Sequence, residues 1–451
     1  MRCWKSVAVI IFMFLPVILL FSALAILAVN VPYWDDYGAV VRYMGWPFAE
    51  RIHHLFDFHN EHRIVTVRLF LEIMAVITGK VNFKACMILG TAQLLIVYAC
   101  FAVVFLRQFG RTGGFLVLSL VAWHLFSMLN FDNAFWALTA MENFGVLMWA
   151  FLAIAFYCWK GGVVRRSMSW GFAILAVLTS AQGLAVLGAM ILISLVPDGD
   201  CGSWRDIWRN IRMRPPYRTV VVVVLSTLVS LLYFRGFSSG SAAEAVVSAS
   251  VIDKVLYVIA FLGNLVPIYP IALVCGCFVT AGIGYVVWSF PKLPIGMRPV
   301  FFFMLYCAGV ALSGVFFRAS DPRVALSFRY YVITACLFIS LVGCLLSLPG
   351  WLTRIGRKCL PAMVIGFCLM DLAVFYVGWP MFAERNEALR ANILTWPKHI
   401  GGLRIEGNDS MAASQALLRL EEKGLYDHKV LLRNGETPPQ EPVPWPQPHF
   451  P

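Results

Sequence analysis

Residues 7–29, VAVIIFMFLPVILLFSALAILAV, determine the class of this chain because they contain no charged side chain. A helix of about 20 apolar residues crosses the hydrocarbon layer of a bilayer. Similar apolar runs recur along the chain. Of its 451 residues, 60% are hydrophobic and 13% are charged, and the mean hydropathy is +0.77. Soluble domains carry roughly a quarter charged residues, so the composition indicates an all-α polytopic membrane protein.

The apolar runs predict eleven transmembrane segments. The stretch 170–196 is interrupted by Ser180-Ala181-Gln182-Gly183, which favours two shorter helices, 170–180 and 183–196. The other nine segments are expected near 7–29, 83–106, 113–130, 143–160, 218–236, 268–290, 299–317, 330–348 and 360–380.

The net charge is +12, and the positions of the basic residues follow the predicted topology. Clusters of Lys and Arg lie at alternate ends of the segments, so a cytoplasmic N-terminus places every cluster inside, as the positive-inside rule requires. This distribution explains the basic charge without a nucleic-acid partner. The clusters are Arg2 and Lys5; Arg107 and Arg111; Lys160, Arg165 and Arg166; Arg205, Arg209, Arg212, Arg214 and Arg218; Lys292 and Arg298; and Arg354, Arg357 and Lys358.

This topology divides the chain into a membrane part, 1–380, and a C-terminal part. The longest loop between spans, 30–82, lies outside, and its residues 64–79 are predicted to form an amphipathic helix with Arg68 and Glu72 at i,i+4. Residues 381–437 are polar and predict a small helical appendage outside. Residues 438–451 are Pro-rich and are expected to be extended and disordered.

An acidic pair, Asp35-Asp36, follows the first span within Tyr33-Trp34-Asp35-Asp36-Tyr37. A neighbouring like charge and partial burial raise the pKa of a carboxyl group, which suits a general base. We favour Asp36 as the base, with Asp35 orienting it or binding a cation. The alternative is an ordinary loop acid in an aromatic belt.

A polar cluster follows at His59-Asn60-Glu61-His62-Arg63. His59 and His62, three residues apart, would share a helical face and could hold a metal. The order of residues does not match the HExxH zinc motif, however. Contacts of His59, Glu61, His62 and Arg63 with an acceptor sugar or a phosphate are the preferred interpretation, and a solvated interfacial segment is the alternative. A divalent cation therefore remains open as a cofactor.

Arginines at 318, 323 and 329 lie outside, where the positive-inside rule disfavours them. The guanidinium fork binds phosphate through two hydrogen bonds, so Arg318, Arg323 and Arg329, with Tyr330, are candidates for a phosphate site. A salt bridge to Asp321 or contact with lipid headgroups is the alternative. Glu142, in a short exterior loop, is either a second site acid or the partner of an exterior arginine.

These features resemble the GT-C glycosyltransferases, which use polyprenyl-phosphate-linked sugars. The resemblance covers roughly residues 1–380. It rests on Trp34-Asp35-Asp36-Tyr37, on His59-Asn60-Glu61-His62-Arg63-Ile64, on the broken helix pair around Ser180-Ala181-Gln182-Gly183, and on Ala325-Leu326-Ser327-Phe328-Arg329-Tyr330. The second of these is similar to a stretch of serotype-converting O-antigen glucosyltransferases of bacteria. The chain contains no nucleotide-binding fingerprint, which agrees with a lipid-linked donor.

The resemblance implies an inverting transfer outside the bacterial cytoplasmic (inner) membrane, to a glycan acceptor such as the O-antigen of lipopolysaccharide. Asp36 or Asp35 would deprotonate the acceptor hydroxyl. The three exterior arginines would stabilise the departing polyprenyl phosphate, and the lipid tail would lie in a groove along 255–290. Neither the sugar nor the oligomeric state follows from these residues.

Two other classes compete with this interpretation. A lipid-linked-sugar flippase or transporter predicts ionisable residues in the middle of the membrane, where His124 and Asp371 are the notable examples. An O-antigen polymerase or ligase also uses exterior arginines, but usually in one large late loop, whereas the longest loop between spans here is the first.

Overall fold

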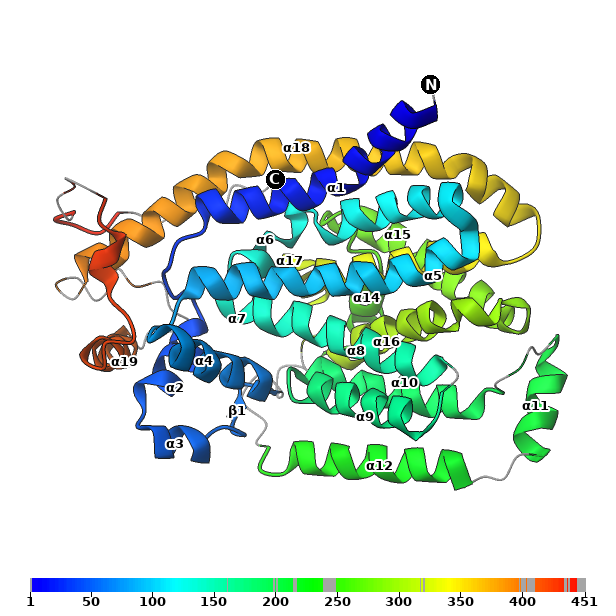
Figure 1. Cartoon of the computed structure of the whole chain (residues 1–451), viewed down its shortest axis with the longest axis horizontal. Coiled ribbons are helices and arrows are strands. Elements are labelled where there is room, and N and C mark those ends of the chain that lie inside the picture. The colour runs from blue at the N-terminus through cyan, green and yellow to red at the C-terminus, as the bar shows by residue number, and fades with distance from the viewer. Residues whose placement is uncertain are drawn as a thin grey trace.

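The computed structural model is almost entirely helical, with one short β-hairpin (Figure 1). It describes residues 2–159, 161–197, 199, 202–213, 217–237, 249–316, 318, 321–396, 398, 403, 410–433, 436 and 439–443. Most of the Pro-rich tail expected at 438–451 therefore lies outside the described residues.

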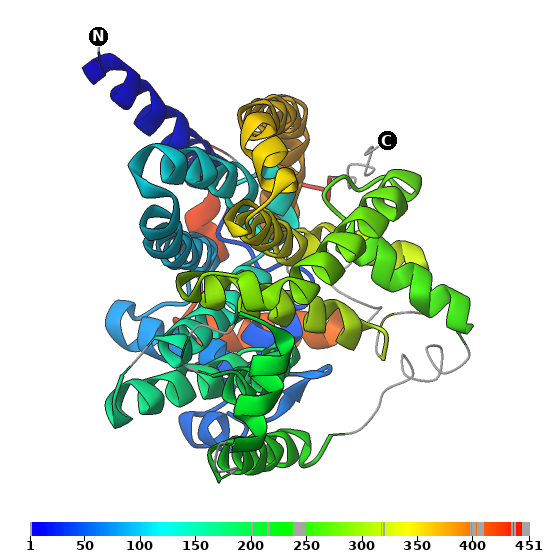
Figure 2. The ribbon, with the colours of Figure 1, turned by 90° about the vertical axis from the view of Figure 1, so that its right-hand side faces the viewer.

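Within these ranges, eight helices are long and apolar enough to cross a membrane, which confirms the all-α polytopic class. They form a bundle that Figure 2 shows from one end. The helices that make up most of these spans are α1 (Arg2–Leu27), α5 (Phe83–Leu125), α8 (Gly145–Cys158), α12 (Tyr217–Phe234), α15 (Tyr269–Trp288), α16 (Arg298–Gly314), α17 (Phe328–Ser347) and α18 (Trp351–Thr395).

The expected eleven segments differ from these eight in two places. First, α5 covers two of the expected spans but is counted once. The chain reverses direction at Gly110, where φ is 67°, and the two arms of α5 lie side by side, since the rings of Tyr98 and Phe126 are 6.1 Å apart (Figure 1). Second, α9 (Val163–Val177) and α10 (Leu184–Leu195) have only 15 and 12 residues, and each is too short to cross a bilayer fully by itself.

The predicted interruption between α9 and α10 is confirmed. Ser180 is extended, with φ −162° and ψ 155°, and a 3₁₀ turn, η4 (Ala181–Gly183), follows it. A Cβ atom on Gly183 would lie 2.1 Å from the carbonyl oxygen of Ala176. The close approach of the two half-helices therefore requires glycine at this position.

The first loop folds into a layer at one end of the bundle, which we call the first-loop end (Figure 1). It contains α2 (Arg42–Gly45), α3 (Phe48–His53), β1 (Phe58–His59), β2 (His62–Arg63) and α4 (Val65–Thr78). The helix α4 confirms the one expected at 64–79. Its Arg68 donates to three backbone carbonyls between residues 54 and 57, at 2.7–3.0 Å, while Glu72 pairs instead with Arg51 at 2.8 Å.

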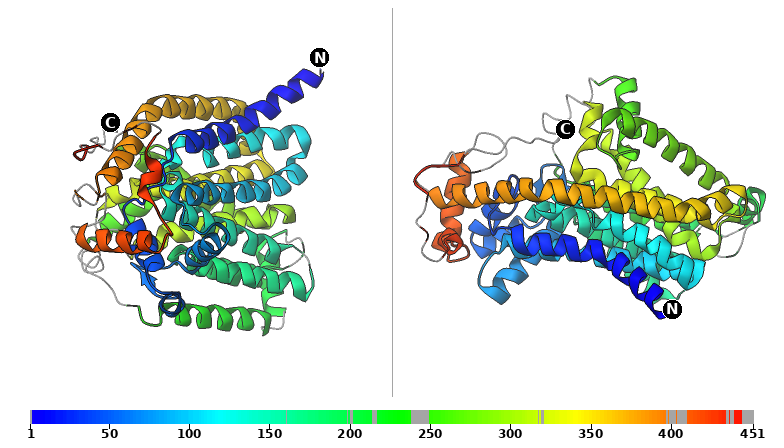
Figure 3. Two further views of the ribbon diagram at one scale, coloured as in Figure 1. Left: turned by 60° about the vertical axis from the view of Figure 1, so that its left-hand side comes forward. Right: turned by 90° about the horizontal axis from the view of Figure 1, so that it is seen from above.

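The C-terminal part returns to the same end. The helix α18 has 45 residues and continues through Pro380, so the boundary expected at 380 lies inside a helix. At 1.5 Å per residue it spans roughly 68 Å, about twice the hydrocarbon thickness. It leads to α19 (Ser410–Glu422) (Figure 3), whose Ala416 carbonyl lies 3.5 Å from the Cβ position of Gly45 in the first loop.

Glycine allows the closest helix contact between α14 (Val251–Leu262) and α15. A Cβ atom on Gly276 would lie 1.9 Å from the carbonyl oxygen of Ile259. We therefore expect Gly276→Ala to lower the midpoint of thermal unfolding, because the backbones must separate and overpacking costs about 1–3 kcal/mol. Gly284→Ala on the same helix is the control, since nothing lies within 4 Å of its Cβ position. Equal midpoints for the two variants would contradict the prediction.

Candidate functional site

A cavity of about 800 Å³ opens between α10, α12, α14 and α16. Its apolar wall extends along α10 from Leu184 to Leu192, which corresponds to roughly 12 Å. Tyr257, Phe261 and Ile283 contribute to it, so the groove expected along 255–290 forms only one side. The apolar lining consists of Ala181, Leu184, Ala185, Gly188, Ala189, Ile191, Leu192, Phe234, Phe261, Ile283, Leu305, Ala308, Gly309, Val310, Leu312 and Gly314.

Charged and polar side chains line the cavity at the first-loop end. Arg318 donates a hydrogen bond from Nη2 to Oε1 of Glu61. The same Oε1 lies 3.5 Å from Nε2 of His62, and Tyr330 lines the cavity as well. The structure thus brings together the polar cluster of the first loop and two residues of the late exterior arginine segment.

Glu61 and Arg318 stabilise each other's ionised forms. Burial opposes ionisation of Glu61, but His62 and Arg318 outweigh it and hold the pKa of the Glu61 carboxyl below its ordinary value. Burial likewise disfavours the charged form of Arg318, but Tyr330 and Glu61 together raise the pKa of its guanidinium. Both groups are therefore ionised at neutral pH, and they form an ion pair at the end of the apolar cavity.

His62 connects this cluster to the break between α9 and α10. Its Nδ1 accepts from the backbone N–H of Ala181 at 3.2 Å and lies 3.3 Å from Oγ of Ser180. Nε2, on the other side of the ring, lies toward Glu61. Oε1 of Glu142 also lies 3.5 Å from Nδ1. Glu142 is only 6% exposed, and this contact with His62 favours the first of its two expected roles, a second site acid.

A chain of side-chain amides extends from the cavity into the bundle. Gln182 donates to Asn143 at 3.2 Å, and Asn143 donates to Asn133 at 2.7 Å. Asn133 then donates to the carbonyl oxygen of Arg329 at 3.0 Å. The guanidinium of Arg329 lies over the Trp136 ring, 5.3 Å from its centroid, rather than in the cavity.

The acidic pair divides into a buried and a half-buried residue. Asp36 is 0% exposed, and its carboxylate accepts from the backbone N–H groups of Tyr33 and Leu138 at 3.0 and 2.9 Å. Asp35 is half-buried. This burial favours Asp35, not Asp36, as the carboxylate that a substrate can reach, and gives Asp36 the role of holding the segment in place.

The acidic pair lies close to the cavity cluster. Leu138, which donates to Asp36, and Glu142, which contacts His62, are four residues apart on the continuous helical segment α7 (Ala137–Thr139) and η3 (Ala140–Phe144). Four residues of helix rise by roughly 6 Å. The backbone position that holds Asp36 is therefore about one helical turn from the acid that contacts His62.

The backbone around both acids is irregular. Trp34, directly before Asp35, has a φ of 52°, which is a genuine outlier for a bulky residue. Two short π-helices lie beside these acids. One is η1 (Tyr37–Val41), directly after Asp36, and the other is η3, which contains Glu142. Such strain and π-helical turns concentrate at functional sites, so this geometry supports a functional role for the segment.

The buried Asp36 predicts a pH dependence of stability. Burial raises the pKa of its carboxyl from the ordinary value of 3.8 to about 7, against the backbone hydrogen bonds from Tyr33 and Leu138. The folded protein then binds a proton that the unfolded chain has released. Its free energy of unfolding should therefore fall between about pH 4 and pH 7, on the order of 4 kcal/mol in total.

Asp36→Asn should remove this slope, since asparagine does not titrate. The measurement is the midpoint of thermal unfolding in detergent at several pH values, with Glu50→Gln, an exposed acid of the same loop, as the control. An unchanged slope in Asp36→Asn would contradict the assignment.

Three further candidate residues, Arg63, Arg323 and His59, do not line the cavity either. Arg63 donates to the carbonyls of Tyr233, at 2.7 Å, and of Phe56 and Arg235, so it ties the first loop to the end of α12. Arg323 is exposed. His59 lies next to the acidic segment, with its ring 3.5 Å from the Cβ position of Gly38.

The prediction that His59 and His62 share one face of a helix is wrong. The two residues are paired across the hairpin of β1 and β2, and the turn between them is closed by Asn60 with a φ of 51°, a conformation that asparagine tolerates. Among the described residues, the three ligand-type side chains close enough to share a metal ion are Glu421, Asp427 and His428, in the C-terminal part. The role of a divalent cation at the acidic pair stays a prediction.

Several residues of the cavity were missed as site residues. Gln182 and Tyr257 line it, and Asn143 continues the amide chain. The signal for Gln182 was available, because a polar residue inside the interrupted stretch 170–196 has no reason to face lipid. Tyr257 gives no such signal, since tyrosine is common at membrane interfaces.

Comparisons with known proteins add no family to this geometry. A scan against models of protein families, a search of curated proteins and a search of solved structures each found no match.

Proposed function

We propose that this protein is a membrane glycosyltransferase that moves a sugar from a polyprenyl-phosphate-linked donor to a glycan acceptor. The observation that carries the proposal is the apolar cavity that ends at Arg318, Glu61 and His62. A long apolar chain joined to a phosphate fits such a cavity, because the chain is buried along the helices while the phosphate meets a cation.

In the proposed reaction, the prenyl tail lies along α10 and α16 and its phosphate binds Arg318. This arginine is paired with Glu61 in the structure, so the phosphate has to displace or share that carboxylate. Asp35 removes the proton of the acceptor hydroxyl. The resulting oxygen nucleophile attacks the anomeric carbon, and the bond to the phosphate oxygen breaks with inversion. Arg318 stabilises the charge that develops on the departing polyprenyl phosphate.

The first-loop end then faces the exterior of a bacterial inner membrane, where an O-antigen or a similar glycan is the acceptor. A transporter or flippase is less favoured, because the intramembrane acid Asp371 is occupied by structural hydrogen bonds. It accepts from Ser127 and from the backbone N–H of Met128 at 3.2 Å. A carboxylate held in this way ties two helices together and is poorly placed to carry a substrate or a proton.

The test is a transfer assay with purified protein in liposomes that contain an undecaprenyl-phosphate-linked hexose and cell-envelope glycan. Sugar appearing on the glycan with the opposite anomeric configuration, together with released undecaprenyl phosphate, is the expected result. Mass spectrometry of surface glycan from cells with the gene deleted and restored is the second measurement. A hexose-sized loss on deletion supports the proposal, whereas unchanged glycan with accumulated lipid-linked sugar would favour a flippase or a polymerase.

A further inference from the structure

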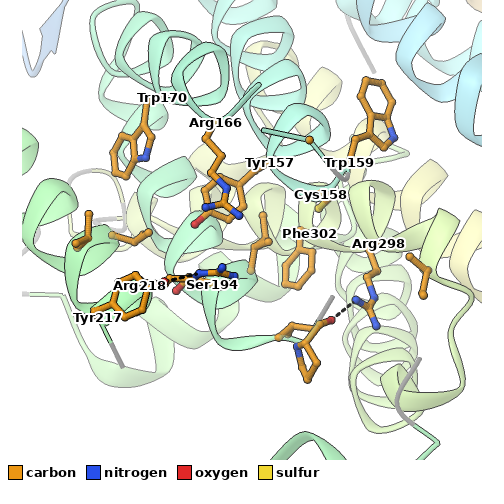
Figure 4. Close-up of a pocket in the computed structure, with 17 residues that line it drawn as sticks. Tyr157, Cys158, Trp159, Arg166, Trp170, Ser194, Tyr217, Arg218, Arg298 and Phe302 are labelled. Carbon is orange, nitrogen blue, oxygen red and sulfur yellow. Dashed lines mark hydrogen bonds between the residues drawn. The ribbon is translucent and has the colours of Figure 1, made fainter. Parts of the chain in front are cut away.

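A second cavity, of about 490 Å³, lies at the opposite end of the same helices (Figure 4). Its residues come from the end of α8, the start of α9, the end of α10 and the starts of α12 and α16. The polar end of the first cavity lies at the opposite ends of α10, α12 and α16. Since α16 has 17 residues, the two polar regions are separated by roughly 25 Å.

The second cavity is strongly cationic. Arg166, Arg218 and Arg298 line it, and among the residues that the structure describes its lining contains no carboxylate. Figure 4 shows these arginines on three different helices around one space. Arg298 is buried, whereas Arg166 and Arg218 are exposed at the mouth of the cavity. Like charges around one cavity repel one another, so an anion bound between them would relieve the repulsion.

One donor atom of these arginines, Nε of Arg298, lacks a hydrogen-bond acceptor among the described residues. Arg298 is 8% exposed and donates from its two Nη atoms to the carbonyls of Pro197 and Gly199. Its Nε is buried and has no hydrogen-bond partner within the described part of the chain. Buried donors nearly always have a partner, and a ligand oxygen in this cavity would supply the missing acceptor.

The remaining lining indicates that the anion is attached to a lipid. Tyr157, Trp159, Trp170 and Tyr217 are of the type that lies at headgroup level. Val221 of α12 lines the cavity and is 52% exposed, and α12 as a whole is apolar and little buried. The cavity is therefore continuous with a surface that faces acyl chains.

We propose that this cavity binds the phosphate of an anionic membrane phospholipid, with the phosphate among Arg166, Arg218 and Arg298 and the acyl chains along α12. The bidentate guanidinium fork and the phosphate match in charge and geometry. The site is separate from the proposed transfer site and does not depend on sugar transfer.

The test uses the full chain in detergent, with phosphatidylglycerol, phosphatidylcholine or inorganic phosphate as the probe. Native mass spectrometry measures lipid retention, and thermal unfolding measures stabilisation. The variant is Arg166→Gln with Arg218→Gln. The matched control, Arg107→Gln with Arg111→Gln, removes the same charge from exposed positions of α5 outside the cavity.

We expect the cavity variant to lose retention of phosphatidylglycerol at least tenfold, while the control variant retains the lipid as the wild type does. Equal retention in both variants overturns the proposal, as does equal retention of phosphatidylcholine and phosphatidylglycerol by the wild type. Stabilisation by inorganic phosphate without any by phosphatidylglycerol would assign the cavity to a soluble phosphate compound and overturn the lipid assignment. If the double variant does not fold, Arg166→Gln alone, at an exposed position, gives the same comparison.

Discussion

Replacement of Asp35 by asparagine is expected to lower kcat for sugar transfer by about 10²–10⁴-fold, the usual contribution of a general base. Asparagine has nearly the same shape but cannot take the proton of the acceptor hydroxyl. Since Asp35 is half-buried, the change should leave the thermal midpoint close to that of the wild type. The measurement is turnover in the liposome assay together with thermal unfolding of the same preparation.

Asp36→Asn provides the contrast. Both backbone N–H groups that face Asp36 need an acceptor, and an amide offers only one acceptor oxygen. This variant should therefore lose stability, and its activity loss should follow the fraction of protein that is folded. Glu50→Gln should change neither quantity. If Asp36→Asn were fully folded and inactive while Asp35→Asn were active, the base would be Asp36 and the present assignment would be wrong.

The hydropathy pattern and the positions of the basic clusters along the chain were sufficient to predict the class of fold. The interruption at Ser180–Gly183 was also predictable, because a small and polar stretch stops an apolar helix locally. The boundary between the spans expected at 83–106 and 113–130 was predictable as well, since the chain turns back at Gly110, between Arg107 and Arg111. Pro380 was expected to end the membrane part, but proline in a long helix often causes only a kink, and α18 continues through it.

The candidate site was only partly predictable for a different reason. Arg63 and Arg318 look equivalent in sequence, because each is a cation of a predicted exterior segment. Arg63 is occupied by carbonyls near the end of α12, while Arg318 lines the cavity. These assignments depend on contacts between residues more than 150 positions apart, which no local pattern contains.

Replacement of Arg318 by glutamine is expected to reduce kcat/KM for the lipid-linked donor by about 10²–10³-fold, as for the loss of a group that stabilises developing charge. Of the three arginines in the late exterior segment, Arg318 lines the cavity. Arg318→Lys keeps the charge but not the fork, so it should recover part of the activity. Arg323→Gln is the matched control, because Arg323 belongs to the same segment but is exposed.

Loss of Arg318 also leaves Glu61 half-buried without its cation, which is itself destabilising. The double variant Glu61→Gln with Arg318→Gln removes that unpaired charge and should restore the thermal midpoint while activity stays low. Recovery of activity in the double variant would mean that Arg318 serves only to neutralise Glu61. In that case the phosphate of the donor would need a different cation, and Arg329 would be the next candidate because it belongs to the same segment and lies over Trp136 beside the acidic pair.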